Sequence, residues 1–238
     1  MLCALALETS GRIGSVALVE DGRVVAADQF SHGLQHAAGL LPMIDRLTTA
    51  RGWKPPDIAE IYVSAGPGSF TGLRIGITLA KTIAMATGAK LVAVPTMRVL
   101  LMNAPPEAEE VILVLDAKRG QIYTARYVRR PSSTSGLMDE WTEAESAHLN
   151  TLGAMIDRSG RPVYLLGEGI PYHKAAATGE GVFLTDESAW RARAENVAAL
   201  GGAMAGAGQF IKPDEFLPIY VRLPEAEEKR LAATTAGR

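Results

Sequence analysis

Hydrophobic positions in the first hundred residues switch repeatedly between strand-like and helix-like patterns. Apolar runs predict strands at residues 3–8, 13–20 and 23–30, and the Asp21-Gly22 pair between the last two indicates a tight hairpin. Helical spacing of apolar residues follows at residues 36–51. The next predicted elements are a strand at 58–64, a helix at 71–87 and a strand at 90–94. This order predicts a mixed α/β sheet covered by helices.

A second half begins after residues 103–110, where two prolines and three acids break all periodicity. Residues 111–116 form an apolar strand that ends in an acid, and a polar glycine turn and an alternating strand at 121–128 follow. The first half opens in the same way, which indicates either a duplicated fold or two unrelated hairpins. The remaining expectations are an exposed loop at 131–139, helices at 151–158 and 196–210, and strands at 163–166 and 182–185.

The segment from Ser64 to Gly76 is a glycine-rich loop between a predicted strand and a predicted helix. Unpaired N–H groups and the positive dipole end at a helix N-terminus suit an anion such as phosphate. The loop lacks the Gly-Lys-Ser/Thr sequence of the Walker motif, and its glycines at 66, 68 and 72 do not match the dinucleotide fingerprint. A tight structural turn is the alternative interpretation. Within this loop, Thr71 is the expected N-cap of the helix.

Composition limits the classes of function. With 24 Lys and Arg against 26 Asp and Glu, the net charge of -2 does not favour binding of a polyanion by this chain alone. A single cysteine excludes an internal disulfide. The N-terminus lacks the pattern of a signal peptide, and no apolar run approaches the roughly 20 residues of a membrane span. We therefore expect a cytoplasmic protein that has no membrane partner.

Four segments taken together resemble the bacterial TsaB (YeaZ-like) family. They are the glycine-rich loop, residues 5–10, residues 115–123 and residues 218–222. The resemblance spans nearly the whole chain and implies a duplicated actin-like ATPase (ribonuclease H-like) fold of two subdomains, each a mixed sheet covered by helices. We expect the subdomains to span residues 1–104 and 105–223, and a charged, disordered tail to occupy 224–238.

The resemblance also implies a function. Members of this family act as non-catalytic dimerisation and scaffold subunits in the synthesis of N6-threonylcarbamoyladenosine at position 37 of tRNA. The implied partners are the catalytic subunit TsaD, the ATPase TsaE and a second copy of the chain, and tRNA is contacted only through the complex. No cofactor is expected to be required, although weak or shared ATP or ADP binding in the complex is compatible with the fold.

Candidate site residues follow from the loop and from the two strand-ending acids. The loop residues expected to contact phosphate or a partner are Gly66, Gly68, Ser69, Thr71 and Gly72. Glu8 and Asp116 stand where kinases of the superfamily hold magnesium. Because the family is non-catalytic, we expect these two acids to be vestigial, and no catalytic residue is assigned.

The predicted helices of the first half are the expected partner interface. Gly72, Gly76, Ala80 and Ala84 recur at every fourth residue, so they form a small-residue stripe that suits close helix packing. The resemblance implies that part of this surface contacts TsaD or a second copy, and packing on the chain's own sheet is the alternative. The candidate interface residues are His36, Leu40, Leu41, Ile44, Arg74, Gly76 and Ala80.

Two rival classes of function remain open. One is an enzyme of the actin superfamily, either a small-molecule kinase or a glycoprotease-like hydrolase. His32 and His36 have metal-ligand spacing, but the acid of H-E-x-x-H is replaced by Gly33, so no metal is expected. The other rival is a homodimeric structural protein that has no role in tRNA modification.

Overall fold

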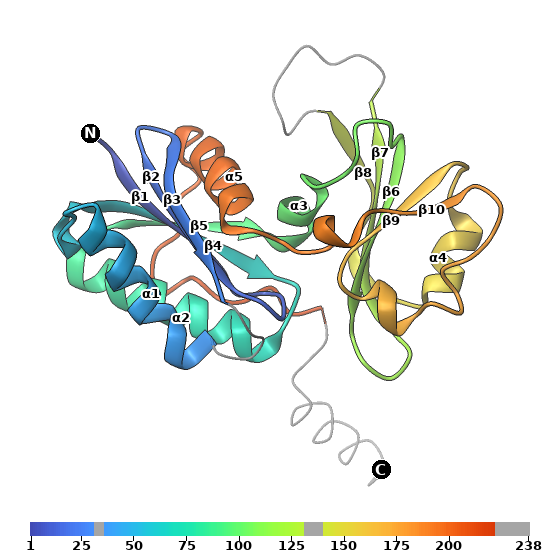
Figure 1. Cartoon of the computed structure of the whole chain (residues 1–238), viewed down its shortest axis with the longest axis horizontal. Helices are drawn as coiled ribbons and strands as arrows, with labels where there is room; N and C mark the ends of the chain where they lie inside the picture. Colours follow the sequence, from blue (N-terminus) through green and yellow to red (C-terminus); the bar gives the residue numbers. More distant parts are fainter. Residues whose placement is uncertain (31–35, 131–139, 222–238) are drawn as a thin grey trace, which may run out of the picture.

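The computed structural model describes residues 1–30, 36–130 and 140–221, and it contains two five-stranded sheets that lie side by side (Figure 1). The first sheet consists of β1 (Cys3–Glu8), β2 (Ser15–Glu20), β3 (Arg23–Gln29), β4 (Ile58–Gly66) and β5 (Lys90–Pro95). The second sheet consists of β6 (Glu110–Asp116), β7 (Ile122–Arg129), β8 (Trp141–Asn150), β9 (Val163–Leu166) and β10 (Val182–Leu184). The helices are α1 (His36–Ala50), α2 (Phe70–Thr87), α3 (Thr96–Leu101), α4 (Leu152–Arg158) and α5 (Ala194–Gly206). Three short 3-10 helices complete the set: η1 (Pro55–Asp57), η2 (Ile170–Tyr172) and η3 (Glu187–Ala189).

The two sheets repeat one topology. The first has the order β3-β2-β1-β4-β5, and the second, written from its other edge, has the order β8-β7-β6-β9-β10. In each sheet the first strand pairs antiparallel with the second and parallel with the fourth. The duplicated fold is therefore confirmed, and the alternative of two unrelated hairpins is excluded.

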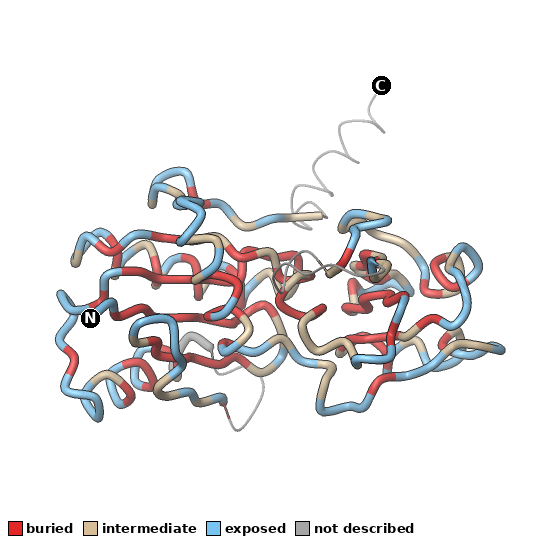
Figure 2. The backbone as a smooth tube through the Cα atoms, turned by 90° about the horizontal axis from the view of Figure 1, so that it is seen from above, coloured by how far each residue is buried: buried red, intermediate tan, exposed pale blue. Residues whose placement is uncertain are grey.

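The core of the first half lies on both faces of its sheet. Leu5 and Leu7 of β1 face the layer that α1 and α2 form, whereas Ala4 and Ala6 face α5. Because side chains alternate along a strand, a strand buried on both faces reads as a continuous apolar run. Figure 2 shows buried positions along the strands of both sheets.

The helix α5 belongs in space to the first half. Its residues Val197, Ala198 and Leu200 pack with β1, β2, β4 and β5. After α5, Ile211 bridges Leu91 of β5, and the N–H of Ile219 donates to the carbonyl of Ala65 at 2.7 Å. The expected division into 1–104 and 105–223 therefore needs correction, because residues 194–221 return to cover the first sheet.

Besides the three 3-10 helices, one α-helix and one strand were not predicted. The helix α3 is only six residues long, and β8 is a polar edge strand whose residues 142–144 are exposed. Neither has the long apolar pattern by which elements are recognised. The predicted loop at 131–139, the His32 side chain and the predicted tail at 224–238 lie outside the described residues.

Neighbouring glycines in α5 provide a test of this packing. A Cβ on Gly201 would overlap the ring of the buried Tyr62, whereas a Cβ on Gly202 would meet open space. We expect Gly201→Ala to lower the free energy of unfolding by about 1–3 kcal/mol through overpacking. We expect Gly202→Ala to raise it by about 0.5–1 kcal/mol, because alanine has the higher helix propensity. Urea denaturation measures both values, and equal shifts in the two variants would contradict this placement of α5.

Candidate functional site

The candidate site is the cleft where the loops of the two halves meet. In each half, the first strand and the parallel strand beside it end at the same edge of the sheet, so their following loops lie together. The first half contributes the turn at 9–12 and the loop Gly66-Pro67-Gly68, and the second contributes the turn at 117–121 and the loop Gly167-Glu168-Gly169.

The glycine-rich loop of the first half packs directly against the turn after β1. A Cβ on Gly68 would lie 2.5 Å from the carbonyl oxygen of Ser10, and one on Gly72 would overlap the carbonyl oxygen of Thr9. The N–H of Ser69 donates to the same Ser10 oxygen at 2.6 Å. The glycines therefore permit an approach of main chain to main chain that any side chain would block.

The N-cap of α2 is Ser69, which corrects the expectation of Thr71. The Ser69 hydroxyl accepts from the N–H of Gly72 at 3.2 Å, and α2 begins at Phe70. Thr71 is an exposed residue of the first turn. This cap satisfies one of the N–H groups proposed for phosphate, and the role of the loop in binding phosphate or a partner stays a prediction.

The second half repeats this contact. A Cβ on Gly169 would lie 2.7 Å from the backbone nitrogen of Asp116, and Gly167 has a φ of 141°. The N–H of Gly169 donates to the carbonyl of Val114 at 2.9 Å. Sequence reasoning missed this loop, although an apolar strand followed by G-x-G occurs in both halves at the same point of the repeat.

Glu8 is the last residue of β1, directly before the turn at 9–12, and its side chain is completely buried. Its carboxylate accepts hydrogen bonds from the Ser10 N–H at 2.6 Å, from the Ser10 hydroxyl and from the Ser64 hydroxyl. Burial raises the pKa of the Glu8 carboxyl, against these hydrogen bonds, which favour the charged form. Glu8 therefore connects the turn to the end of β4 through its hydrogen bonds with Ser10 and Ser64.

Asp116 has partners from its own half. Lys118 Nζ lies 2.8 Å from Oδ2, and His173 Nε2 lies 3.4 Å from Oδ1. Burial acts to raise the pKa of Asp116, but the Lys118 hydrogen bond and charge, with a smaller effect of His173, lower it overall. The two candidate acids thus end the first strand of each half. Glu8 is hydrogen-bonded by Ser10 and Ser64, and Asp116 is paired with Lys118.

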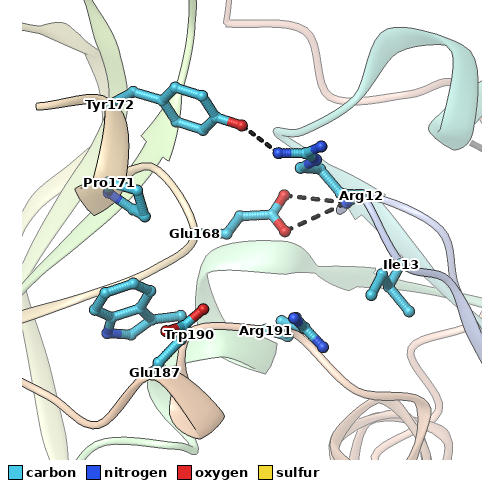
Figure 3. A pocket seen from close by; sticks show the side chains of 8 residues that line it. All are labelled: Arg12, Ile13, Glu168, Pro171, Tyr172, Glu187, Trp190 and Arg191. Atoms are coloured by element: carbon cyan, nitrogen blue, oxygen red, sulfur yellow. Dashed lines mark hydrogen bonds between the residues drawn. The ribbon is translucent and has the colours of Figure 1, made fainter. Parts of the chain in front are cut away.

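A cavity of ≈ 320 Å³ lies between the two halves (Figure 3). Arg12 and Ile13 line it from the first half. The lining residues from the second half are Glu168, Pro171, Tyr172, Glu187, Trp190 and Arg191. None of the eight was predicted as a site residue, because they come from loops whose sequences carry no recognised motif.

Glu168 bridges the two halves within this cavity. Its carboxylate oxygens accept from the backbone N–H of Arg12 at 3.1 and 3.3 Å, and the Arg12 guanidinium donates to the hydroxyl of Tyr172 (Figure 3). Burial raises the pKa of the Glu168 carboxyl. The Arg12 N–H, which faces the cleft, is therefore already taken by the protein's own carboxylate.

These groups do not fit a magnesium triphosphate. Mg²⁺ keeps several water ligands and needs open carboxylate oxygens, whereas Glu8 is inaccessible and Asp116 is paired with Lys118. Within residues 1–30, 36–130 and 140–221, no group of three or more His, Cys, Asp or Glu side chains is placed to hold a metal ion.

Burial corrects the expected helix interface. Leu40, Ile44, Gly76 and Ala80 lie inside the chain, and a Cβ on Gly76 would overlap the Thr9 hydroxyl oxygen. The small-residue stripe is thus internal packing. Leu41 is 55% exposed. The side chain of His36 lies outside the described residues, although its backbone begins α1.

Arg74, another expected interface residue, lies against the returning C-terminal segment. Its guanidinium stacks 3.9 Å above the ring of Phe70, and its Nε donates to the hydroxyl of Tyr220 at 3.1 Å. Phe70 and Tyr220 stack with their ring centroids 5.0 Å apart. The segment that includes Tyr220 therefore lies beside the first turn of α2.

Known proteins match the chain along nearly its whole length. The tRNA threonylcarbamoyladenosine biosynthesis protein TsaB of Bacillus subtilis (strain 168) is 30% identical over 94% of this chain and 96% of its own. The chain belongs to the TsaB family. The TsaB protein of Escherichia coli (strain K12) is 29% identical over 92% of this chain and 94% of its own. A solved structure of YeaZ from Pseudomonas aeruginosa superposes with a TM-score of 0.76 at 28% identity, covering 92% of this chain and 100% of that one.

A family model described as TsaD: tRNA N6-adenosine threonylcarbamoyltransferase also matches residues 32–158. That match covers only part of the chain, whereas the TsaB proteins match it from end to end. Membership in the TsaB family and the actin-like fold of two mixed sheets are thereby confirmed. In the described part of this TsaB-family chain, no helix is long and apolar enough to cross a membrane.

The buried Glu8 predicts a pH effect. Its folded-state pKa is raised above the unfolded value of about 4.3, so the folded chain loses stability as pH rises through the folded pKa. The amide of Glu8→Gln does not titrate, so the variant lacks this pH dependence. We therefore expect the free energy of unfolding of Glu8→Gln, minus that of the native chain, to increase between about pH 4 and pH 8. Urea unfolding across this range measures the difference, and a flat or falling difference would contradict the assignment.

Proposed function

We propose that this chain is a non-catalytic subunit in the synthesis of tRNA threonylcarbamoyladenosine and that it binds and activates TsaD. The end-to-end match with proteins named for this biosynthesis supports the reaction, and the arrangement of the cleft supports the non-catalytic role. The observation that carries the second point is that Glu168 of one half occupies the turn N–H of the other. The cleft thereby serves to join the two halves.

The proposed TsaD surface is the outer face of α1 and α2, defined by Leu41, Thr78, Thr82 and Met85. These four residues are exposed, and Leu41 and Met85 are large apolar side chains with 55% and 77% of their surface in solvent. The inner face of the same helices packs on the first sheet, so the outer face has a fixed orientation toward a partner. A second copy of the chain fits the same surface when TsaD is absent.

The remaining partners enter through the assembled complex. We propose that TsaE joins the assembly formed with TsaD and that tRNA is held by the complex. The net charge of -2 supports this division, because an isolated RNA-binding chain would present a strongly positive surface. The proposed role requires no cofactor bound to this chain alone and is exerted in the cytoplasm.

Two exposed leucines, one in each half, test the surface. We expect Leu41→Asp to remain folded and to lose association with TsaD, because an unpaired carboxylate buried in an apolar contact costs several kcal/mol, on the order of the contact itself. Leu184→Asp is the matched control, since Leu184 of β10 is 51% exposed and lies in the other half. Copurification with TsaD and circular dichroism measure the two properties. A folded Leu41→Asp protein that still copurifies at the native level would show that the surface is wrongly placed.

Reconstitution tests the accessory role. We expect the purified chain with threonylcarbamoyl-adenylate, Mg-ATP and tRNA to form no threonylcarbamoyladenosine and to hydrolyse ATP negligibly, because Glu8 is buried and Asp116 is paired with Lys118. Adding it to TsaD should raise the modification rate. Substantial turnover by the chain alone that is abolished by Asp116→Asn, whose near-isosteric amide removes only the charge, would identify an enzyme instead.

A further inference from the structure

The cavity of ≈ 320 Å³ between the two halves has the dimensions of a small-molecule site, which the proposed subunit role does not use. Pockets that hold small ligands are commonly about 300–1,000 Å³, mostly apolar, and carry a few convergent polar groups. Here the apolar walls come from Ile13, Pro171 and Trp190. The indole N–H of Trp190 donates to the carbonyl of Thr185 at 3.0 Å, so this wall has a fixed orientation.

The charged groups around the cavity are balanced. Glu168 and Glu187 contribute two carboxylates, while Arg12 and Arg191 contribute two guanidinium groups. A nucleoside triphosphate would place several negative charges beside both carboxylates, which like-charge repulsion opposes. A ligand that carries one positive and one negative group matches this lining.

Both charge types are available to a ligand. The Glu168 carboxylate accepts from one backbone N–H, and a carboxylate has about four acceptor sites, so capacity remains. In the part of the chain that the structure describes, Arg191 and Glu187 enter hydrogen bonds through their backbone oxygens. Figure 3 shows the Arg191 guanidinium beside the space between Glu168 and Trp190.

We propose that this cavity binds a small zwitterion of the amino-acid class with an apolar or aromatic side chain. The ligand's ammonium group donates to Glu168, its carboxylate pairs with the Arg191 guanidinium, and its side chain packs against Trp190. Arg12 and Ile13 of the first half close the other side of the site. This binding is independent of association with TsaD.

Calorimetric titration of the full chain with L-phenylalanine tests the proposal. We expect saturable binding with one site per chain. Because a hydrogen bond to a charged group is among the stronger polar contacts, 2-phenylethylamine and 3-phenylpropionate, which each lack one charge, should bind at least about tenfold more weakly. Mg-ATP should show no binding at this site.

Substitutions locate the binding. We expect Arg191→Gln and Glu168→Gln each to weaken phenylalanine binding at least about tenfold, while Arg23→Gln on the distant exposed hairpin leaves it unchanged. Arg191 makes no side-chain hydrogen bond within the described residues, so Arg191→Gln decides the result if Glu168→Gln fails to fold. Absence of saturable binding below about 10 mM, equal binding of the singly charged analogues, or native affinity in Arg191→Gln would each overturn the proposal.

Discussion

The close approach of the glycine-rich loop to the turn after β1 is the constraint on which the first half depends. Gly68 and Gly72 bring the loop and the first turn of α2 against the main chain of Ser10 and Thr9, and Gly76 packs against the Thr9 side chain. This contact sets where α2 crosses the sheet. Through α2 it also sets the position of α1, which packs beside α2 over the same core. The glycine-rich loop, whose composition suggests ligand binding, thus also packs α2 against the turn after β1.

The same geometry accounts for the electrostatics of the cleft. Because the loop covers the first turn, Glu8 is shut off from water and accepts hydrogen bonds from Ser10 and Ser64. On the open side of that turn, the N–H of Arg12 meets Glu168 from the second half. The protein's own carboxylates, Glu8 and Glu168, thus occupy both sides of the turn. This favours a fixed arrangement of the two halves over a cycle of opening around a phosphate.

Much of the fold could be predicted from the sequence, and particular residues show why the rest could not. Strands such as β1 and β6 are buried on both faces, so their apolar runs are unmistakable, and the acid at each end revealed the repeat. Periodicity could not tell whether the stripe through Gly76 and Ala80 faces a partner or the chain's own sheet, because both need small residues. The cavity residues escaped prediction because Arg12 and Glu168 are 156 positions apart and meet only in three dimensions.

The return of α5 to the first sheet has a consequence for how the protein is made. During synthesis, the face of β1 formed by Ala4 and Ala6 emerges early, but the helix that covers it follows almost two hundred residues later. The second half must therefore leave the ribosome before the first half can complete its core. An unfinished chain exposes an apolar sheet face throughout that interval, and transiently exposed apolar surface of this kind promotes aggregation.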